Sequence, residues 1–293
     1  MKPEPVSAEC DGDMSYLLTD ERWCVSHLFA LRWPEGFVCP FCGYRPPGQL
    51  PVRQVVCRRC GRMSTVTAGT LLHGSKKELN CWFRAIWWLI CNAADATTRD
   101  LQRELGFAGY QTAWTWMGKL RSALRELVEE RISGMVVVGS GELPGGRRDQ
   151  CLYHFLVAVE SVAGGRLSGA VRMASVDSVE AGAVSGFIRD HVLPGSVVVV
   201  PDREPFTPPV EMDCYIYIAD DANSNALVLR EVLEHFYTWY RRRKYQPFSR
   251  HRMQGQLDEF CFTRTVLLCR NKAELFDRVL MGVIGHGPQG GEG

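Results

Sequence analysis

The sequence predicts an α+β chain of several domains, with a small metal-binding region, then a helical region, then a mixed sheet covered by helices. Three observations support this prediction. Paired cysteines lie near the N-terminus, helical periodicity runs through residues 75–132, and apolar strand-like runs bounded by glycines begin after residue 134. The 293 residues, 46% of them hydrophobic, are enough for two ordinary domains or one large one with a buried core.

Composition and pattern divide the chain into five regions. They are a tail with one amphipathic helix (1–35), a Cys, Gly and Pro-rich region (36–70), a helical block (71–133), a strand-rich region with further helices (134–285) and a disordered tail (286–293). The first helix, LTDERWCVSHLFALRW, has Thr19 or Asp20 placed as its N-cap.

Charge and hydropathy limit the class of protein. The 34 basic and 33 acidic residues nearly cancel, so any affinity for nucleic acid must come from local basic patches. The N-terminus lacks an apolar signal core, and the longest apolar run, AIWWLICNAA, is too short to cross a bilayer. We therefore expect a soluble intracellular protein without a membrane partner, cytoplasmic and nucleoid-associated, or nuclear if the source is a eukaryote.

The cysteines of the second region have the spacing of metal ligands. The motifs CPFC and CRRC are separated by 14 residues, and two such motifs let four thiolates converge tetrahedrally on one Zn²⁺. Glycines follow each motif, at 43 and 61, where a tight turn lets backbone N–H groups face the sulfurs. The sequence thus predicts a zinc ribbon with a structural zinc ion; four buried free cysteines are the alternative. The predicted ligands are Cys39, Cys42, Cys57 and Cys60.

Arginines lie beside these cysteines. Arg53, Arg58, Arg59 and Arg62 could hold phosphates, although a solvated basic loop would have the same sequence. The other eight cysteines stand in apolar contexts and are expected in the core.

The helical block contains a pair of helices with a short glycine turn between them. The first begins near Thr98 and ends at Gly106, and the second begins after Gly109. Helical periodicity turns four residues of the second helix inward and leaves three outward. This is the pattern of a helix-turn-helix, whose second helix enters the major groove of DNA; an ordinary helical hairpin is the alternative. The inward residues are Ala113, Trp116, Met117 and Leu120, and the outward, DNA-binding candidates are Gln111, Thr112 and Lys119.

The strand-rich region starts with three aliphatic runs, VVVG, LYHFLVAVES and LSGAVRMAS, which predict a meander. A helix, VEAGAVSGFIRDHV, two more strands, SVVVVPD and CYIYIAD, and three helical segments follow. This order of elements is typical of an RNase-H-like mixed sheet.

Several stretches of the chain carry a resemblance to a known family. The runs FALRWPEGFVCPFCG, VCRRCGRMSTVTAGTLLHGSKKELNCWFRAIWWL and LQRELGFAGYQTAWTWMGKLRSAL resemble the N-terminal half of bacterial zinc-ribbon insertion-sequence transposases, which are relatives of the eukaryotic Merlin transposases. FSRHRMQGQLDEFCFTRT and NKAELFDRVLMGVI resemble the last helices of that family. The resemblance extends from about residue 20 to 285, dense in the first half and thin in the middle.

The resemblance implies an RNase-H-like core with a DDE-type carboxylate triad and two divalent ions, Mg²⁺ or Mn²⁺, that cut and rejoin DNA. Carboxylates suit this chemistry because two hard cations must be held close together. It also implies double-stranded DNA with terminal inverted repeats as the partner, and a homo-oligomer as the working form.

The triad does not match at every position. Aligned on the glycine pair at 145 and 146, the family's first acid falls at Ser140, and Glu142 is the nearest carboxylate on the same face of a continuing strand. The second acid matches Asp202, and the third falls near Glu234, with Glu231 and His235 as alternatives. The tentative catalytic set is therefore Glu142, Asp202 and Glu234.

Three readings of function follow. The favoured one is a DNA-binding protein of this family, a degenerate or domesticated copy that cuts DNA weakly or not at all, because losing one carboxylate weakens the hold on both ions. The second is an active divalent-metal-dependent transposase with a shifted triad. The third, a zinc-stabilised scaffold, predicts no affinity for duplex DNA.

Overall fold

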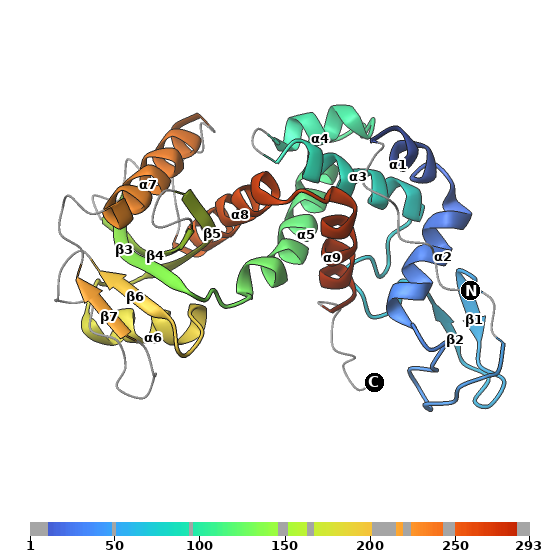
Figure 1. Cartoon of the computed structure of the whole chain (residues 1–293). Coiled ribbons are helices and arrows are strands. Elements are labelled where there is room, and N and C mark those ends of the chain that lie inside the picture. Colours follow the sequence, from blue (N-terminus) through green and yellow to red (C-terminus); the bar gives the residue numbers. More distant parts are fainter. Residues whose placement is uncertain are drawn as a thin grey trace. The chain divides into compact units, whose positions relative to one another are not determined.

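Figure 1 shows the protein as a computed structural model. The residues that it describes are 11–48, 51–93, 96–145, 152–162, 167–200, 215–218, 224–242 and 250–285. The chain forms two compact units: the first unit is Met1–Leu127 with Cys269–Gly293, and the second unit is Val128–Leu268.

The first unit contains six helices and a two-stranded ribbon among its described residues. They are α1 (Asp11–Leu17), α2 (Glu21–Arg32), β1 (Gln54–Val56), β2 (Met63–Thr65), α3 (Leu79–Cys91), α4 (Thr98–Glu104), α5 (Tyr110–Glu129, whose last residues lie past the unit boundary) and α9 (Lys272–Gly285). Asp20 is the N-cap of α2, and its carboxylate accepts a hydrogen bond from the N–H of Arg22 at 2.9 Å. One of the two N-cap predictions is thus confirmed.

Aromatic packing holds the helices of the first unit together. Trp82 of α3 is buried and stacks on Trp116 of α5, with ring centroids 3.4 Å apart. Phe83 of α3 is fully buried and meets Phe276 of α9 edge-on at 5.4 Å. The apolar face of α3 is therefore core, as its helical spacing predicts.

The last helix, α9, closes the first unit although it lies at the other end of the chain. Its Asp277 pairs with His27 of α2 at 2.6 Å, and the carbonyl of Val283 accepts from the N–H of Leu71. The predicted division places residues 272–285 with the strand-rich region, whereas the structure packs α9 on α2 and α3. The difference arises because the apolar side of α9 is buried against the helices of the first unit. Its buried residues include Leu275, Phe276, Val279, Leu280 and Val283.

The ribbon is joined to these helices by a carboxylate and an arginine of α2. Glu21 accepts from the N–H groups of Leu79 and Asn80 at the start of α3 and pairs with Arg53 just before β1. Arg32 donates to the carbonyl of Val66, just after β2, at 2.7 Å. These bonds tie the metal-binding region to the helical part of the same unit.

The second unit is built on a five-stranded mixed sheet with the order β5-β4-β3-β6-β7. Its elements are β3 (Met135–Pro144), β4 (Leu152–Val162), β5 (Leu167–Val176), α6 (Ala181–His191), β6 (Val197–Val200), β7 (Tyr215–Ile218), α7 (Ser224–Arg242) and α8 (Arg250–Leu268). The first three strands form the predicted antiparallel meander, and β6 and β7 run parallel to β3. Figure 1 shows this sheet in green and yellow between α6 and α7.

Side chains alternate between the two faces of the sheet along each strand, and helices cover both faces. Val136 and Val138 of β3 belong to a buried cluster with Val184 and Ile188 of α6. On the opposite face, Phe155 of β4 meets Phe236 of α7 at 5.1 Å. At the edge of the sheet, the side chain of Gln254 in α8 accepts from the N–H of Ser175 and donates to the carbonyl of Met173 in β5.

No helix in the described part of the chain is long and apolar enough to cross a membrane.

Candidate metal centre and nucleic-acid interface

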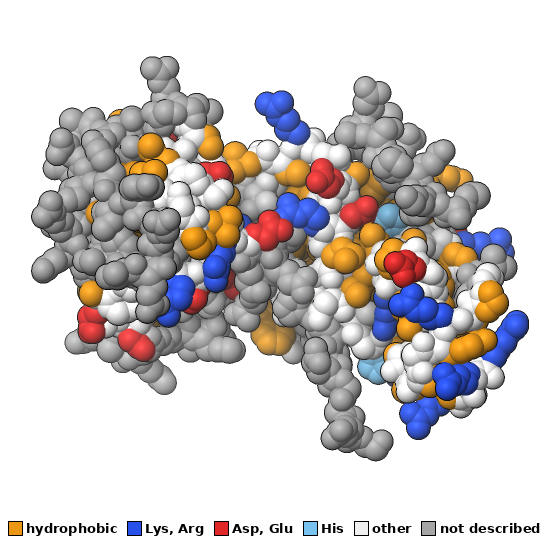
Figure 2. All heavy atoms as spheres, turned by 60° about the horizontal axis from the view of Figure 1, so that its bottom comes forward, with side chains coloured by type: hydrophobic (Ala, Val, Ile, Leu, Met, Phe, Trp, Pro, Cys, Tyr) orange, Lys and Arg blue, Asp and Glu red, His pale blue; other side chains and the backbone are white. Residues whose placement is uncertain are grey.

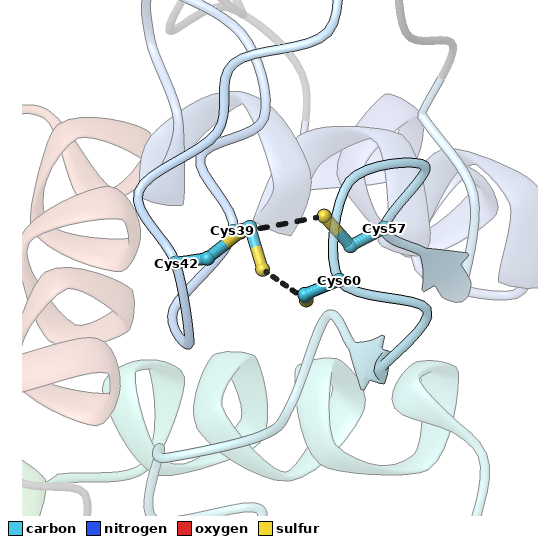
Figure 3. A group of neighbouring side chains, drawn as sticks. All are labelled: Cys39, Cys42, Cys57 and Cys60. Carbon is cyan, nitrogen blue, oxygen red and sulfur yellow. Dashed lines mark hydrogen bonds between the residues drawn. The ribbon is translucent and has the colours of Figure 1, made fainter.

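The four predicted ligands come together in the ribbon. The sulfur atoms of Cys39, Cys42, Cys57 and Cys60 all lie within 4.8 Å of one another. Sγ of Cys39 is 3.7 Å from that of Cys60, and Sγ of Cys42 is 3.6 Å from that of Cys57. Figure 3 shows the four side chains pointing toward one another from two loops. Among the described residues this is the one group of three or more potential ligand side chains that converges.

The two loops share one backbone design, which explains why the sequence repeats C-x-x-C-G. In the first loop, the N–H of Cys39 donates to the carbonyl of Tyr44, and the N–H of Gly43 donates to the carbonyl of Cys39. Cys57, Gly61 and Arg62 repeat both bonds in the second loop. Gly43 (φ 66°) and Gly61 (φ 71°) supply the left-handed turns that bring each second cysteine back toward the first.

The electrostatics of the cluster suit a metal. The N–H groups of Cys60 and Arg59 point at the sulfur of Cys57 and lower the pKa of its thiol to about 6. The N–H of Tyr44 lowers the pKa of Cys42, but desolvation and hydrogen bonds with the other three sulfurs outweigh it and raise this pKa to about 12. A soft donor set of four thiols, closed to water as a fifth ligand, fits a structural zinc ion and not a catalytic one. Bound zinc would hold the two loops together and take no part in chemistry.

The surface around the cluster is basic. Arg58, Arg59 and Arg62 are all exposed, and the guanidinium of Arg62 lies over the ring of Phe41, 5.1 Å from its centroid. No aspartate or glutamate occurs from residue 36 to residue 77, a range that contains Arg45, Arg53, Arg58, Arg59, Arg62, Lys76 and Lys77. Zinc with four thiolates would carry two negative charges, so this segment keeps a net positive charge when the metal is bound. Figure 2 shows Lys and Arg side chains gathered over the part of the first unit that holds β1 and β2 in Figure 1.

The helix pair α4 and α5 lies where the sequence predicts it. Gly106, with φ 62°, follows α4, and α5 begins directly after Gly109. The four residues predicted to face inward are all buried: Ala113, Trp116, Met117 and Leu120.

The three outward candidates on α5 do not all behave as predicted. Gln111 and Thr112 are exposed. Lys119 is half-buried, because its Nζ donates to the carbonyl of Leu71 at 2.8 Å and lies 5.7 Å from the ring of Trp82. The prediction that Lys119 faces outward is wrong for this physical reason: its long stem reaches a carbonyl inside the first unit. Trp114 and Tyr110 are exposed rings on α5, and helical spacing from Gln111 would have indicated Trp114.

Two of the three carboxylates predicted for catalysis, Glu142 and Glu234, lie among the described residues. Glu142 lies near the end of β3 with an exposed side chain, and its Oε1 is 3.2 Å from Nδ1 of His154, its cross-strand neighbour. Strand alternation places Glu142 on the same side as Val136 and Val138, the side that α6 covers. Glu234 is exposed on α7, which covers the opposite side. The structure therefore does not bring Glu142 and Glu234 together, and Asp202 lies outside the described residues.

The side of β3 that faces α7 carries two glycines. A Cβ built on Gly139 would lie 2.5 Å from Cδ2 of Leu229 in α7, and one on Gly141 would collide with the ring of Phe155. The hydroxyl of Tyr237, also on α7, donates to the carbonyl of Glu142 and accepts from its N–H. Apolar and aromatic side chains thus fill the space beside the end of β3, where a carboxylate would need room.

The alternatives for the third acid have partners of their own. Nδ1 of His235 lies 3.1 Å from Nη1 of Arg264, and Glu231 is close enough to Arg264 to act on its pKa, which burial lowers. Asp258 accepts from Gln254, and Glu259 is buried in α8, so both belong to the packing of that helix.

Comparison with protein families gives a match on the metal-binding part of the first unit. Residues 19–63 match the transposase zinc-ribbon domain of the IS1595 type. No curated protein and no solved structure matches the chain. The match includes all four cysteines that converge in the ribbon. The N-terminal part of this chain therefore matches a transposase zinc-ribbon domain, and its four clustered cysteines could hold a structural zinc ion.

Proposed function

We propose that the protein is a DNA-binding member of the DDE transposases whose catalytic triad is degraded, so that it cuts and joins DNA weakly or not at all. The observation that carries this proposal is the packing at the end of β3, where side chains occupy the space beside the strand. There the α7 side holds glycines packed by Leu229 and Phe155, and the nearest carboxylate, Glu142, turns to the α6 side.

The topology of the second unit supports an RNase-H-like core. An antiparallel meander followed by two parallel strands on the other side of β3, with helices on both faces, matches the order of elements expected for that fold. In such a core the acids must meet near the end of the central strand, next to the helix that bears the third acid. Gly139 and Gly141 are the residues that face α7 at this point.

Two-metal chemistry requires carboxylates that share one small volume, because each hard cation is held mainly by charge. The described carboxylates Glu142 and Glu234 lie on opposite sides of the sheet and do not fit a shared pair of Mg²⁺ or Mn²⁺ ions. A shifted triad of Glu142, Asp202 and Glu234 would require β3 to slip by one residue, which would turn Glu142 toward α7 but would also take Val136 and Val138 out of their buried cluster with α6.

The first unit supports the DNA-binding part of the proposal. Its ribbon offers the exposed Arg58, Arg59 and Arg62 to phosphates, in a stretch of sequence (36–77) without aspartate or glutamate, and α4 with α5 is the helix pair expected of a helix-turn-helix. Phosphate contacts of this kind position a protein on a duplex without reading its sequence. A homo-oligomer on paired terminal inverted repeats, at the nucleoid or in the nucleus, would be the working form if the gene belongs to a mobile element.

The proposal is tested by binding and cleavage of an end-labelled duplex library with a randomised centre. The zinc-loaded full chain should bind at low salt, lose affinity steeply as salt rises, and leave the DNA uncut in Mg²⁺ or Mn²⁺. Asp202→Asn should bind as well as the wild type. The proposal fails if the wild type has no affinity for duplex DNA at low salt. Cleavage that Asp202→Asn abolishes would support the active transposase instead.

A further inference from the structure

The tips of the two cysteine loops carry different chemistry. Between its two cysteines, the first loop holds Pro40 and Phe41, and the second loop holds Arg58 and Arg59. All four residues are exposed. The loops face each other across the sulfur atoms (Figure 3), which come within 3.6 Å between one loop and the other. An aromatic tip therefore lies beside a cationic tip.

The ring of Phe41 is not needed to form its loop. Phe41 is 51% exposed, whereas Phe83 and Phe276 in the core of the same unit are buried. The second loop makes the same backbone hydrogen bonds with an arginine, Arg59, at the matching position. The metal takes only the sulfur atoms. Neither the turn nor the zinc site therefore explains an exposed aromatic side chain here.

The arginines around this ring have no carboxylate partner. Among the residues that the structure describes, Arg58, Arg59 and Arg62 make no ion pair, whereas the two other arginines of segment 36–77 pair with glutamates. The guanidinium of Arg62 lies 5.1 Å from the centroid of the Phe41 ring. A cation–π contact at an exposed site is weak, so a ligand can compete for both groups. We define the loop-tip surface as Phe41, Arg58, Arg59 and Arg62.

An aromatic ring among cations complements a nucleotide whose base is not paired. The flat face of a base stacks on an aromatic side chain, and arginines bind the phosphates on either side of it. In a closed duplex the base faces are stacked on one another, so a protein can reach only phosphates, sugars and base edges. The arginines of the loop-tip surface suit either form of DNA, but the ring suits only the unpaired form.

We propose that the loop-tip surface binds single-stranded DNA, with the ring of Phe41 stacked on an unpaired base and the three arginines on the neighbouring phosphates. This inference rests on the proposed DNA binding and deepens it, because it gives the ribbon a preference for opened or frayed DNA over a closed duplex. Stacking needs no hydrogen bonds to base edges, so the preference is for strandedness and not for sequence.

The experiment compares two probes on the zinc-loaded full chain at low salt: oligo(dT) of about 16 nucleotides and a blunt G·C-rich duplex of the same length. Phe41→Leu keeps an apolar side chain but removes the ring. It should weaken binding of oligo(dT) about tenfold and leave the duplex affinity and the zinc content unchanged. Phe41→Trp should bind oligo(dT) at least as tightly as the wild type. Arg59→Ala should weaken both probes and reduce their salt dependence, because it removes a phosphate contact.

Val56→Ala is the matched control. Val56 is an exposed apolar residue of the same ribbon, 62% accessible, and strand alternation turns it away from the buried side chain of Val55. It should leave both affinities unchanged.

The inference is overturned if Phe41→Leu binds oligo(dT) as the wild type does, or if it weakens the duplex equally. It is also overturned if the wild type binds a peptide of Glu and Phe residues more tightly than oligo(dT), because the surface then docks an acidic protein. A wild type that binds the duplex but not oligo(dT) would refute this inference alone. Binding of oligo(dT) without the duplex would refute the proposed function and leave this inference standing.

Discussion

At the scale of single residues, Gly141 is the position where β3 is most tightly enclosed. Its pairing residue, Phe155, lies directly opposite on β4, and the ring covers the glycine. We expect Gly141→Ala to lower the free energy of unfolding of the second unit by about 1–3 kcal/mol, because the new methyl group must displace a ring held by Phe236. Urea denaturation followed by circular dichroism measures this.

Gly186→Ala in α6 provides the control for Gly141→Ala. It makes the same chemical change in a place with open space, so the free energy of unfolding should stay equal or rise. If Gly141→Ala is as stable as Gly186→Ala, the end of β3 is not filled as described.

The cysteine cluster makes a second prediction at this scale. Cys57→Ser should reduce bound zinc from about one ion per chain to about none, because a structural site needs its four ligands. Metal analysis of the purified protein measures the zinc, and loss of salt-dependent DNA binding should accompany it. Cys91→Ser, an exposed cysteine outside the cluster, should keep the metal. Full zinc content in Cys57→Ser would contradict the assignment.

At the scale of elements, α6 ends in a histidine, His191, whose pKa is shifted by its surroundings. Burial lowers the pKa of His191 below its ordinary 6.5, with Arg172 and Arg131 lowering it further and Asp190 opposing them. The unfolded chain therefore takes up a proton at a pH where the folded chain does not, so stability is full above about 6.5 and falls as the pH drops below that value. Unfolding free energies measured across this range should show the loss.

His191→Phe should reduce this pH dependence, since a phenyl ring can keep the contact with Phe187 without titrating. Equal pH dependence in the wild type and the variant would mean that other groups cause it.

The helices and strands could be predicted from the sequence to the extent that their signals are local. The spacing around Gly106 and Gly109 locates α4 and α5, and the repeated C-x-x-C-G motifs locate the metal ligands. The side chain of Lys119 could not be predicted, since its partner, the carbonyl of Leu71, is distant in sequence. Likewise, alternation puts Glu142 on the face of Ser140, but only the packed structure shows that α6, and not α7, covers that face.

At the scale of the whole molecule, the C-terminal segment packs in the same unit as the N-terminal part of the chain. The apolar stripe on α9 can be recognised in the sequence. The helices on which it packs cannot, because residues 272–285 and 21–91 meet only after folding. The second unit is therefore inserted between α5 and α9 of the first unit. The first unit needs both ends of the chain to complete its core.

Phe276→Ala tests this closure. The buried ring contacts Phe83, Trp87 and His27, so its loss should lower the free energy of unfolding of the first unit by about 3–5 kcal/mol and weaken DNA binding with it. Met281→Ala, on the exposed side of the same helix, should change stability by less than about 0.5 kcal/mol. Equal stability of the two variants, measured by denaturant titration of the full chain, would show that α9 does not complete the first unit.

The most direct test of the account is a crystal structure of the full chain soaked in Mn²⁺, with the metal located by its anomalous scattering. The account predicts zinc between the four cysteines and no pair of manganese ions at the end of β3, with Leu229 and Phe155 still packed on Gly139 and Gly141. Two manganese ions bridged by Glu142, Asp202 and Glu234 would contradict it.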